Sequence, residues 1–157
     1  MLLIPVPVVK STQRIHIMKE ALMSAIFPSL EWLEELKEKL NSDEQYARIA
    51  KKWEGDMLCQ LEPDDTLKES MYLYIDLWHG KCREVAVWDE IGDKKPAFIL
   101  KASYGNFLRV LRGDLDPMQA MLTRKLGVKG NMAVMMRNVP TVLDFVRCAG
   151  EVTSEAL

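Results

Sequence analysis

Apolar residues recur at helical spacing in the first third of the chain. Over residues 30–40 one face is apolar and the other carries glutamates and lysines, which predicts an amphipathic helix. The apolar face consists of Leu30, Leu33, Leu36 and Leu40. A weaker pattern of the same period over residues 12–27 predicts a short helix that stops at Pro28.

Ser42 and Gln45 form an S-x-x-Q capping box, in which the first side chain satisfies a free N–H group of a helix's first turn. We therefore expect a second helix to begin at Ser42. Its apolar face would consist of Tyr46, Ile49, Ala50 and Trp53.

The period changes after Gly55 from helical to alternating. Strands are predicted over residues 57–61, 71–78, 83–89 and 98–100. Side chains alternate along the first three segments, the fourth is a short apolar run after a turn, and turn residues separate the segments. In the second of these segments, both faces of the strand carry bulky side chains. Short links between successive strands favour antiparallel pairing.

The sequence W-H-G-K-C at residues 78–82 allows two interpretations. A metal or redox site would use His79 and Cys82, but metal sites need converging ligands, and the other histidine, His16, lies far upstream. The favoured interpretation is a hairpin turn, in which Gly80 supplies a backbone conformation that other residues disfavour. A ligand or redox role for Cys82 is the alternative.

Helical spacing returns over residues 104–111. Asp116 followed by Pro117 is typical of a helix start, and Asn131 can cap a later helix that Pro140 bends or splits. A last strand is predicted at residues 126–129, between these two helices.

This element order predicts an α+β domain with a five-stranded, mostly antiparallel sheet and helices packed on one face. A chain of 157 residues fits one domain with a sizeable core. We assign residues 1–28 to an N-terminal extension with a short helix, and residues 29–157 to the single domain.

The N-terminal residues and the cysteines indicate the cellular compartment of the protein. The opening M-L-L-I-P-V-P-V-V lacks a basic region and contains two prolines, so we expect neither a signal peptide nor an anchor. The three cysteines are odd in number and far apart, which argues against a disulfide framework or a zinc ribbon. Both features favour the cytoplasm.

Net charge is −2, which argues against a nucleic-acid partner. Residues 101–157 nevertheless carry 8 basic and 5 acidic side chains. A basic surface there could contact an anionic membrane transiently, and the alternative is an ordinary solvated rim. The candidate cations are Arg109, Arg112, Arg124, Lys125, Lys129 and Arg137.

The sequence contains no G-x-S-x-G, H-E-x-x-H, P-loop or G-x-G-x-x-G motif. Its one carboxylate cluster, Glu62, Asp64 and Asp65, fits a solvated loop better than a general acid or base. We therefore expect no catalytic residue, no metal site and no cofactor.

Methionine is abundant, with ten residues in the chain and five of them between positions 118 and 136. Its flexible, polarisable side chain suits surfaces that accommodate variable apolar shapes, although such residues can equally fill a core. The methionines therefore allow a binding cleft without requiring one.

The segment L-D-P-M-Q-A-M-L-T-R-K-L-G-V-K-G-N-M-A-V-M-M-R, residues 115–137, resembles the C-terminal signature of the sterol carrier protein type 2 family. Residues 52–57 continue the resemblance, and L-Y-I-D-L-W-H-G-K-C-R at 73–83 looks like stand-alone prokaryotic members. The resemblance extends over about residues 30–149. The C-terminal Glu155-Ala156-Leu157 differs from the Ser-Lys-Leu peroxisomal address of some relatives.

This resemblance implies an apolar tunnel between sheet and helices that holds a lipid: a fatty acid, a fatty acyl-CoA or a sterol-like molecule. It implies a carrier without catalysis. Residues 1–28 lie outside it. Three interpretations are open for them: a contact in a homodimer, a lid, or an over-long start with Met18 as the natural initiator. The residues expected to contact lipid are Phe107, Leu108, Leu111, Met118, Met121, Met132, Met135, Met136, Val139 and Leu143.

Two other functions remain open. The cleft could bind another protein, as an accessory scaffold, or it could be the substrate pocket of a small-molecule enzyme. In the enzyme the nearest polar candidates are Tyr72, Tyr74 and Asp76. For the carrier, the break at Pro140 motivates the hypothesis that the C-terminal helix gates the cavity.

Overall fold

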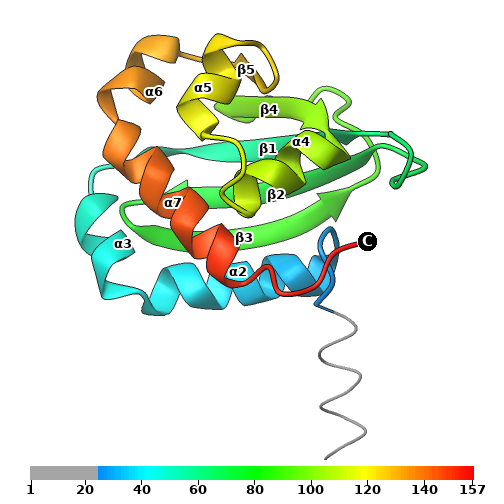
Figure 1. Ribbon diagram of the computed structural model, residues 1–157. Coiled ribbons are helices and arrows are strands. Elements are labelled where there is room, and N and C mark those ends of the chain that lie inside the picture. Colours follow the sequence, from blue (N-terminus) through cyan, green and yellow to red (C-terminus); the bar gives the residue numbers. More distant parts are fainter. Residues whose placement is uncertain (1–24) are drawn as a thin grey trace, which may run out of the picture.

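The computed structural model describes residues 25–157 and has an α+β architecture (Figure 1). Its sheet has five strands in the order β3-β2-β1-β4-β5. The pairs β1·β2, β2·β3 and β4·β5 are antiparallel, and β1·β4 is parallel. The predicted five-stranded, mostly antiparallel sheet is therefore confirmed.

The strands lie close to their predicted positions. Their bounds are Glu54–Glu62 for β1, Met71–Trp78 for β2, Lys81–Trp88 for β3, Phe98–Ser103 for β4 and Gly127–Lys129 for β5. β3 begins two residues earlier than expected, and the register of β2 against β3 shifts between Asp76 and Leu77. That irregularity breaks the simple alternation from which the start of β3 was predicted.

The helices pack on one face of the sheet, as expected, with α2 beside β3 and α7 crossing in front (Figure 1). Their bounds are Leu30–Ser42 for α2, Glu44–Ile49 for α3, Tyr104–Leu111 for α4, Pro117–Leu122 for α5, Met132–Arg137 for α6 and Val139–Glu151 for α7. Leu33, Leu36 and Leu40 are fully buried, whereas Leu30 at the end of the predicted stripe is 43% exposed.

Two helix starts use the side-chain caps that the sequence predicts for them. The carboxylate of Asp116 accepts a hydrogen bond from the N–H of Gln119, and the amide oxygen of Asn131 accepts one from Val134. The prediction for α3 was wrong by one residue. Asp43 is its cap, and the Ser42 hydroxyl instead ends α2 by donating to the carbonyl of Glu38.

The β2–β3 hairpin confirms the predicted turn. His79 and Gly80 both have positive φ, 49° and 77°, which is the geometry of a two-residue type I′ turn. Gly80 also lies close to α3, where an added Cβ would come within 2.8 Å of the Ala47 carbonyl oxygen. The His79 ring contacts Glu54 and stacks on Trp78, so His79 has structural contacts in the turn.

The link between β5 and α6 explains why the Gly-Asn pair matters. Gly130 has φ +144°, and a Cβ there would lie 2.5 Å from the Ala97 carbonyl oxygen and 2.6 Å from the Phe98 ring. Only glycine allows this link to pass so close to the start of β4. The next residue, Asn131, then begins α6.

Residues at the start of the described chain pair with its C-terminal end. Phe27 bridges to Ala156, is 2% exposed, and its ring packs edge-on against Trp32 with centroids 4.8 Å apart. Phe27 thus belongs to the domain's core, although the sequence-based boundary placed it in the extension. The helix predicted over residues 12–27 lies almost wholly outside the described residues.

Across residues 25–157, none of the helices combines the length and the apolar character needed to cross a bilayer.

Candidate functional site

An apolar cavity lies between the helix-covered face of the sheet and the helices above it. It has about 70 Å³ of free volume. The sheet contributes one face of β1 and of β2, because side chains alternate with period two, and one residue of β4. These residues are Met57, Cys59, Leu61, Leu73, Ile75, Leu77 and Leu100.

The helices and their links supply the rest of the lining. These residues are Phe27, Trp32, Tyr46, Trp53, Phe107, Val110, Leu111, Pro117, Met121, Leu126, Met135, Thr141, Val142, Phe145, Val146 and Ala149. α7 contributes the last five of them, at the i, i+3, i+4 spacing of one helix face. This helix is therefore the main wall opposite the sheet.

The cavity reaches the surface between α4, α5 and α7. Most lining residues are buried, and the five that are half-buried lie on these three helices: Leu111, Met121, Val142, Phe145 and Val146. Figure 1 shows α4 and α5 on one side of α7 and α2 with α3 on the other. We call this opening the cavity mouth.

The few polar atoms of the lining already have partners. The Trp53 indole N–H donates to the Gly55 carbonyl at 2.9 Å, and the Thr141 hydroxyl donates to the Ile49 carbonyl at 3.3 Å. Burial raises the pKa of the Cys59 thiol to about 12, so it stays protonated at neutral pH. A guest would therefore meet mainly apolar surface, without a charged side chain in the lining.

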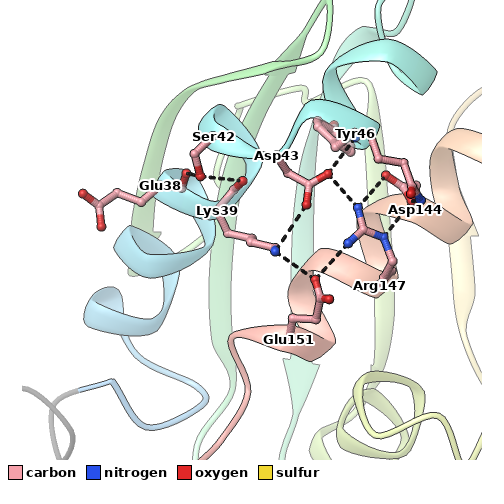
Figure 2. A network of polar contacts seen from close by, with 9 residues as sticks. Glu38, Lys39, Ser42, Asp43, Tyr46, Asp144, Arg147 and Glu151 are labelled. Atoms are coloured by element: carbon pink, nitrogen blue, oxygen red, sulfur yellow. Dashed lines mark hydrogen bonds and ion pairs between the residues drawn. The ribbon is translucent and has the colours of Figure 1, made fainter.

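A network of charged side chains fixes the other edge of α7 (Figure 2). Arg147 donates to both oxygens of Asp144, at 2.9 and 3.2 Å, to Asp43 at 2.7 Å and to Glu151 at 2.9 Å. Lys39 of α2 bridges Asp43 and Glu151 at 3.2 and 2.9 Å. The network joins α7 to the junction of α2 and α3.

Hydrogen bonds within this network stabilise the charged forms of Asp43 and Arg147. The hydrogen bond from Arg147 holds the pKa of Asp43 well below its usual range, and the N–H of Tyr46 adds to this. The same contacts, from Asp144 first and then Asp43, raise the pKa of Arg147. Asp144 is only 5% exposed, and Gln45 donates to it as well, at 2.6 Å.

Residues 33–142 match the SCP-2 sterol transfer family, which is more than half of the chain. The chain belongs to this family. A crystal structure of sterol carrier protein 2 superimposes with a TM-score of 0.70 at 28% identity, over 76% of this chain and 94% of that one. A conserved hypothetical protein from Thermus thermophilus, described as possibly a sterol carrier protein, gives a TM-score of 0.70 at 29% identity, over 78% and 87% of the two chains.

A more distant structure, the sterol carrier protein domain 2 of Helicoverpa armigera, shares the fold at 21% identity, with a TM-score of 0.55 over 77% of this chain and 87% of that one. No curated protein sequence matches the chain. Membership of the SCP-2 family supports binding and transfer of a lipid or sterol. It also confirms the resemblance that the 115–137 signature carries.

Of the ten residues expected to contact lipid in this SCP-2 domain, four line the cavity: Phe107, Leu111, Met121 and Met135. Six lie outside the lining: Leu108, Met118, Met132, Met136, Val139 and Leu143. Three of these six, Met132, Met136 and Leu143, are at least 40% exposed. Contact with a lipid remains a prediction for all ten.

The polar residues considered for an enzyme lie on the opposite face of the sheet. Leu73, Ile75 and Leu77 point into the cavity, so the alternating residues Tyr72, Tyr74 and Asp76 point away from it. Tyr74 donates to Asp56 at 2.8 Å, and Asp76 pairs with Arg83. Tyr74 and Asp76 are therefore already engaged with neighbours on that face.

The predicted acidic loop also has a structural role. The Asp64 carboxylate accepts hydrogen bonds from the N–H groups of Thr66, Leu67 and Gly105, at 2.9, 3.0 and 2.8 Å. These backbone contacts lower the pKa of Asp64. It ties the β1–β2 loop to the start of α4.

One group of side chains in the described part of the chain has metal-ligand spacing. Oxygen and sulfur atoms of Asp43, Asp144 and Cys148 lie within 4.8 Å of one another. However, the guanidinium of Arg147 already donates to both carboxylates, so the position that a cation would neutralise is neutralised by the protein itself. We assign the group to the network of Figure 2.

Proposed function

We propose that this protein takes up one lipid in the cavity and carries it without changing it chemically. The ligand would be a fatty acid, a fatty acyl-CoA or a sterol-like molecule whose apolar part enters between sheet and helices. The observation that carries the proposal is an apolar lining in which, among the described residues, no buried side-chain nitrogen or oxygen atom lacks a hydrogen-bond partner. Such a lining favours holding an apolar guest over reacting with it. Three buried free cysteines are consistent with a reducing compartment such as the cytoplasm.

Apolar burial is large enough to drive such binding. At ~0.8 kcal/mol per CH₂, a chain of ~15 carbons gains ~12 kcal/mol before the costs of association, which are ~4–15 kcal/mol. The free volume of about 70 Å³ holds only ~5 water-sized groups. A full chain therefore needs side chains at the mouth to move.

Adaptable side chains are available for that movement. Met121 and Met135 line the cavity, and methionine repacks at low cost. Pro140 stands at the start of α7, where the chain changes from α6 to α7 at Asn138. We propose that α7 shifts on its cavity side when lipid enters, which retains the gate hypothesis.

The test compares two valine-to-phenylalanine variants. Val146→Phe adds volume inside the cavity, whereas Val87→Phe adds the same atoms on β3, where Val87 is 40% exposed and outside the lining. Wild type and Val87→Phe should show bound lipid in native mass spectrometry after mild purification. Palmitate, palmitoyl-CoA or cholesterol should raise their melting temperature. Val146→Phe should lose both signals by at least tenfold in apparent affinity.

Overpacking alone could destabilise Val146→Phe by ~1–3 kcal/mol, so its fold is checked by circular dichroism. Val142→Phe at the mouth provides a second blocking variant. If wild type holds no lipid and none of the three ligands shifts its melting temperature, the carrier proposal is wrong. If Val146→Phe binds lipid as well as wild type does, the lipid binds outside this cavity.

A further inference from the structure

The five side chains at the cavity mouth differ in how easily they change shape. Four of them are branched or carry a ring: Leu111, Val142, Phe145 and Val146. Valine in particular is stiff about its first torsion angle. The fifth is Met121 on α5, which is unbranched and has more rotatable bonds than any of the other four. Met121 is therefore the most adaptable side chain at the opening through which a guest would enter.

Three methionines of the described chain line the cavity, and they differ in their access to solvent. Met57 and Met135 are 6% and 1% exposed, whereas Met121 is half-buried at the mouth. Of these three thioethers, the one at position 121 is thus the most accessible to a small reagent in solution while the protein stays folded.

A thioether at such a place is open to a specific chemical change. The sulfur lone pair attacks one oxygen of hydrogen peroxide, the O–O bond breaks, that oxygen stays on sulfur as a sulfoxide, and water leaves. The sulfur is oxidised by two electrons and the peroxide is reduced. A flexible apolar side chain becomes a polar, chiral one, and methionine sulfoxide reductases reverse the change.

The cysteines are poor competitors for this oxidant. All three are buried and free. Burial raises the pKa of Cys59 and of Cys82 to about 12 and that of Cys148 to about 11. A thiol reacts with peroxide through its thiolate, which these groups do not form at neutral pH.

The surroundings of Met121 at the mouth do not suit a sulfoxide. The other four mouth side chains contain only carbon and hydrogen, so none of them can donate a hydrogen bond to a sulfoxide oxygen. The oxidised side chain would either keep an unpaired polar group in the apolar entrance or turn out toward water. In both cases an entering lipid loses apolar contact.

We propose that Met121 is a reversible oxidation site that regulates lipid binding. The thioether form admits lipid, and oxidation by hydrogen peroxide to the sulfoxide weakens binding until a reductase restores the thioether. This inference rests on the proposed carrier function, because the quantity that it regulates is the affinity of the cavity for lipid.

The first measurement is the order in which the methionines of the full chain are oxidised. Sulfoxides are mapped by peptide mass spectrometry over time in hydrogen peroxide. Met121 should be modified before Met57 and Met135, which are buried. The matched comparison is Met118, which is half-buried on the same helix and outside the lining. A bound lipid should slow Met121 by at least ~3-fold and leave Met118 unchanged. Oxidation of Met121 no faster than that of Met135 would overturn the inference.

The second measurement is lipid affinity before and after oxidation, with whichever of palmitate, palmitoyl-CoA and cholesterol binds most tightly. Peroxide exposure is limited so that Met57 and Met135 stay unmodified, and each protein is compared with its own unoxidised form. Wild type should lose at least ~5-fold in affinity, and so should Met118→Leu. Met121→Leu has no sulfur at the mouth and should lose less than ~2-fold.

Two further observations complete the test. Treatment with reductases for both sulfoxide epimers should restore the affinity of oxidised wild type. Met121→Gln, with a permanent polar group, should bind at least ~5-fold more weakly than Met121→Leu. If oxidation of Met121 leaves wild-type affinity unchanged, or Met121→Leu loses as much as wild type, this inference is wrong and the carrier proposal stands. If unoxidised wild type binds none of the three lipids, the carrier proposal fails together with it.

Discussion

The two sides of α7 differ sharply in how they are held. Toward α2 and α3, Asp144, Arg147 and Glu151 join the charged network, in which Arg147 alone makes four hydrogen bonds (Figure 2). Toward the cavity, the same helix presents apolar side chains to free space, and Val142 and Val146 are only half-buried. One edge is fixed by directional contacts, and the other faces a gap.

The two sides of α7 therefore have different roles, one in positioning the helix and one in lining the cavity. Directional contacts at the α2–α3 edge fix where α7 stands, because a guanidinium and carboxylates bind well in few geometries. Apolar packing at the cavity side is non-directional and tolerates rearrangement. A helix built in this way can widen the cavity for a guest without losing its place in the fold. Breaking either side should therefore give a different kind of defect.

The largest effect is expected from breaking the fixed edge. Arg147→Ala leaves the nearly buried Asp144 without its main cation and removes the contact to Asp43. Removing one partner of a buried ion pair costs ~3–5 kcal/mol, and because about a third of the Arg147 side chain is exposed, we expect the lower end, ~3 kcal/mol. The measurement is the free energy of unfolding in urea.

Arg137→Ala is the control for this prediction, because Arg137 is exposed and makes no ion pair in the described part of the chain. It should change the free energy of unfolding by less than ~0.5 kcal/mol. If Arg147→Ala costs no more than Arg137→Ala, the network does not hold α7, and the contrast between its two edges loses its basis.

A smaller effect is expected at Asp43, which both caps α3 and joins the network. Asp43→Asn keeps a side-chain oxygen for the N–H of Tyr46 but removes the charge facing Arg147 and Lys39, so we expect a loss of ~1–2 kcal/mol at pH 7. Ser42→Ala, at the cap position that the sequence favoured, should cost less than ~0.5 kcal/mol.

The pH dependence follows from the depressed pKa of Asp43. A carboxyl with a lower pKa in the folded state stabilises the fold above its unfolded pKa of ~3.9, and that contribution is lost as pH falls through the folded pKa. The stability gap between wild type and Asp43→Asn should therefore be constant above about pH 5 and narrow toward pH 2. A gap that widens on acidification would show that the charge of Asp43 is not what stabilises α7.

Local patterns in the sequence predicted most of the fold. The leucine stripe of α2, the caps Asp116 and Asn131, and the His79-Gly80 turn all depend on residues within a few positions of one another, and the structure has each of them. The cap of α3 was misplaced because Ser42 and Asp43 are both good cap residues, and only packing decides between them. The parallel pairing of β1 with β4 has no local signal.

The candidate site was harder to predict for the same reason. Strand residues such as Leu73 and Ile75 alternate identically whether they face a filled core or a cavity, so the alternation gives no sign of the gap, which only the family resemblance implied. The contact of Arg147 with Asp43 joins residues 104 positions apart. α6 has only six residues, which is too short for a helical pattern to identify its buried face. The sequence therefore did not show that Met135 is buried while Met132 and Met136 are exposed.

The smallest effect we predict is a difference in rate between two thiols on opposite sides of α7. Cys148 lies beside Asp43 and Asp144 at the fixed edge and is 0% exposed, whereas Cys59 lines the cavity and is 9% exposed. Burial raises the pKa of Cys148 to about 11 and that of Cys59 to about 12, so both are protonated at pH 8 and react slowly.

The accessibility of each thiol to the reagent then decides which cysteine is modified first. A small apolar reagent such as N-ethylmaleimide can enter through the cavity mouth, so Cys59 should be modified before Cys148, as measured by peptide mass spectrometry over hours. Palmitate should slow Cys59 and leave Cys148 unchanged, while unfolding in urea should expose all three cysteines equally. Earlier modification of Cys148 would mean that the edge of α7 beside α2 and α3 opens more readily than the cavity side, the reverse of the arrangement inferred from the ion pairs.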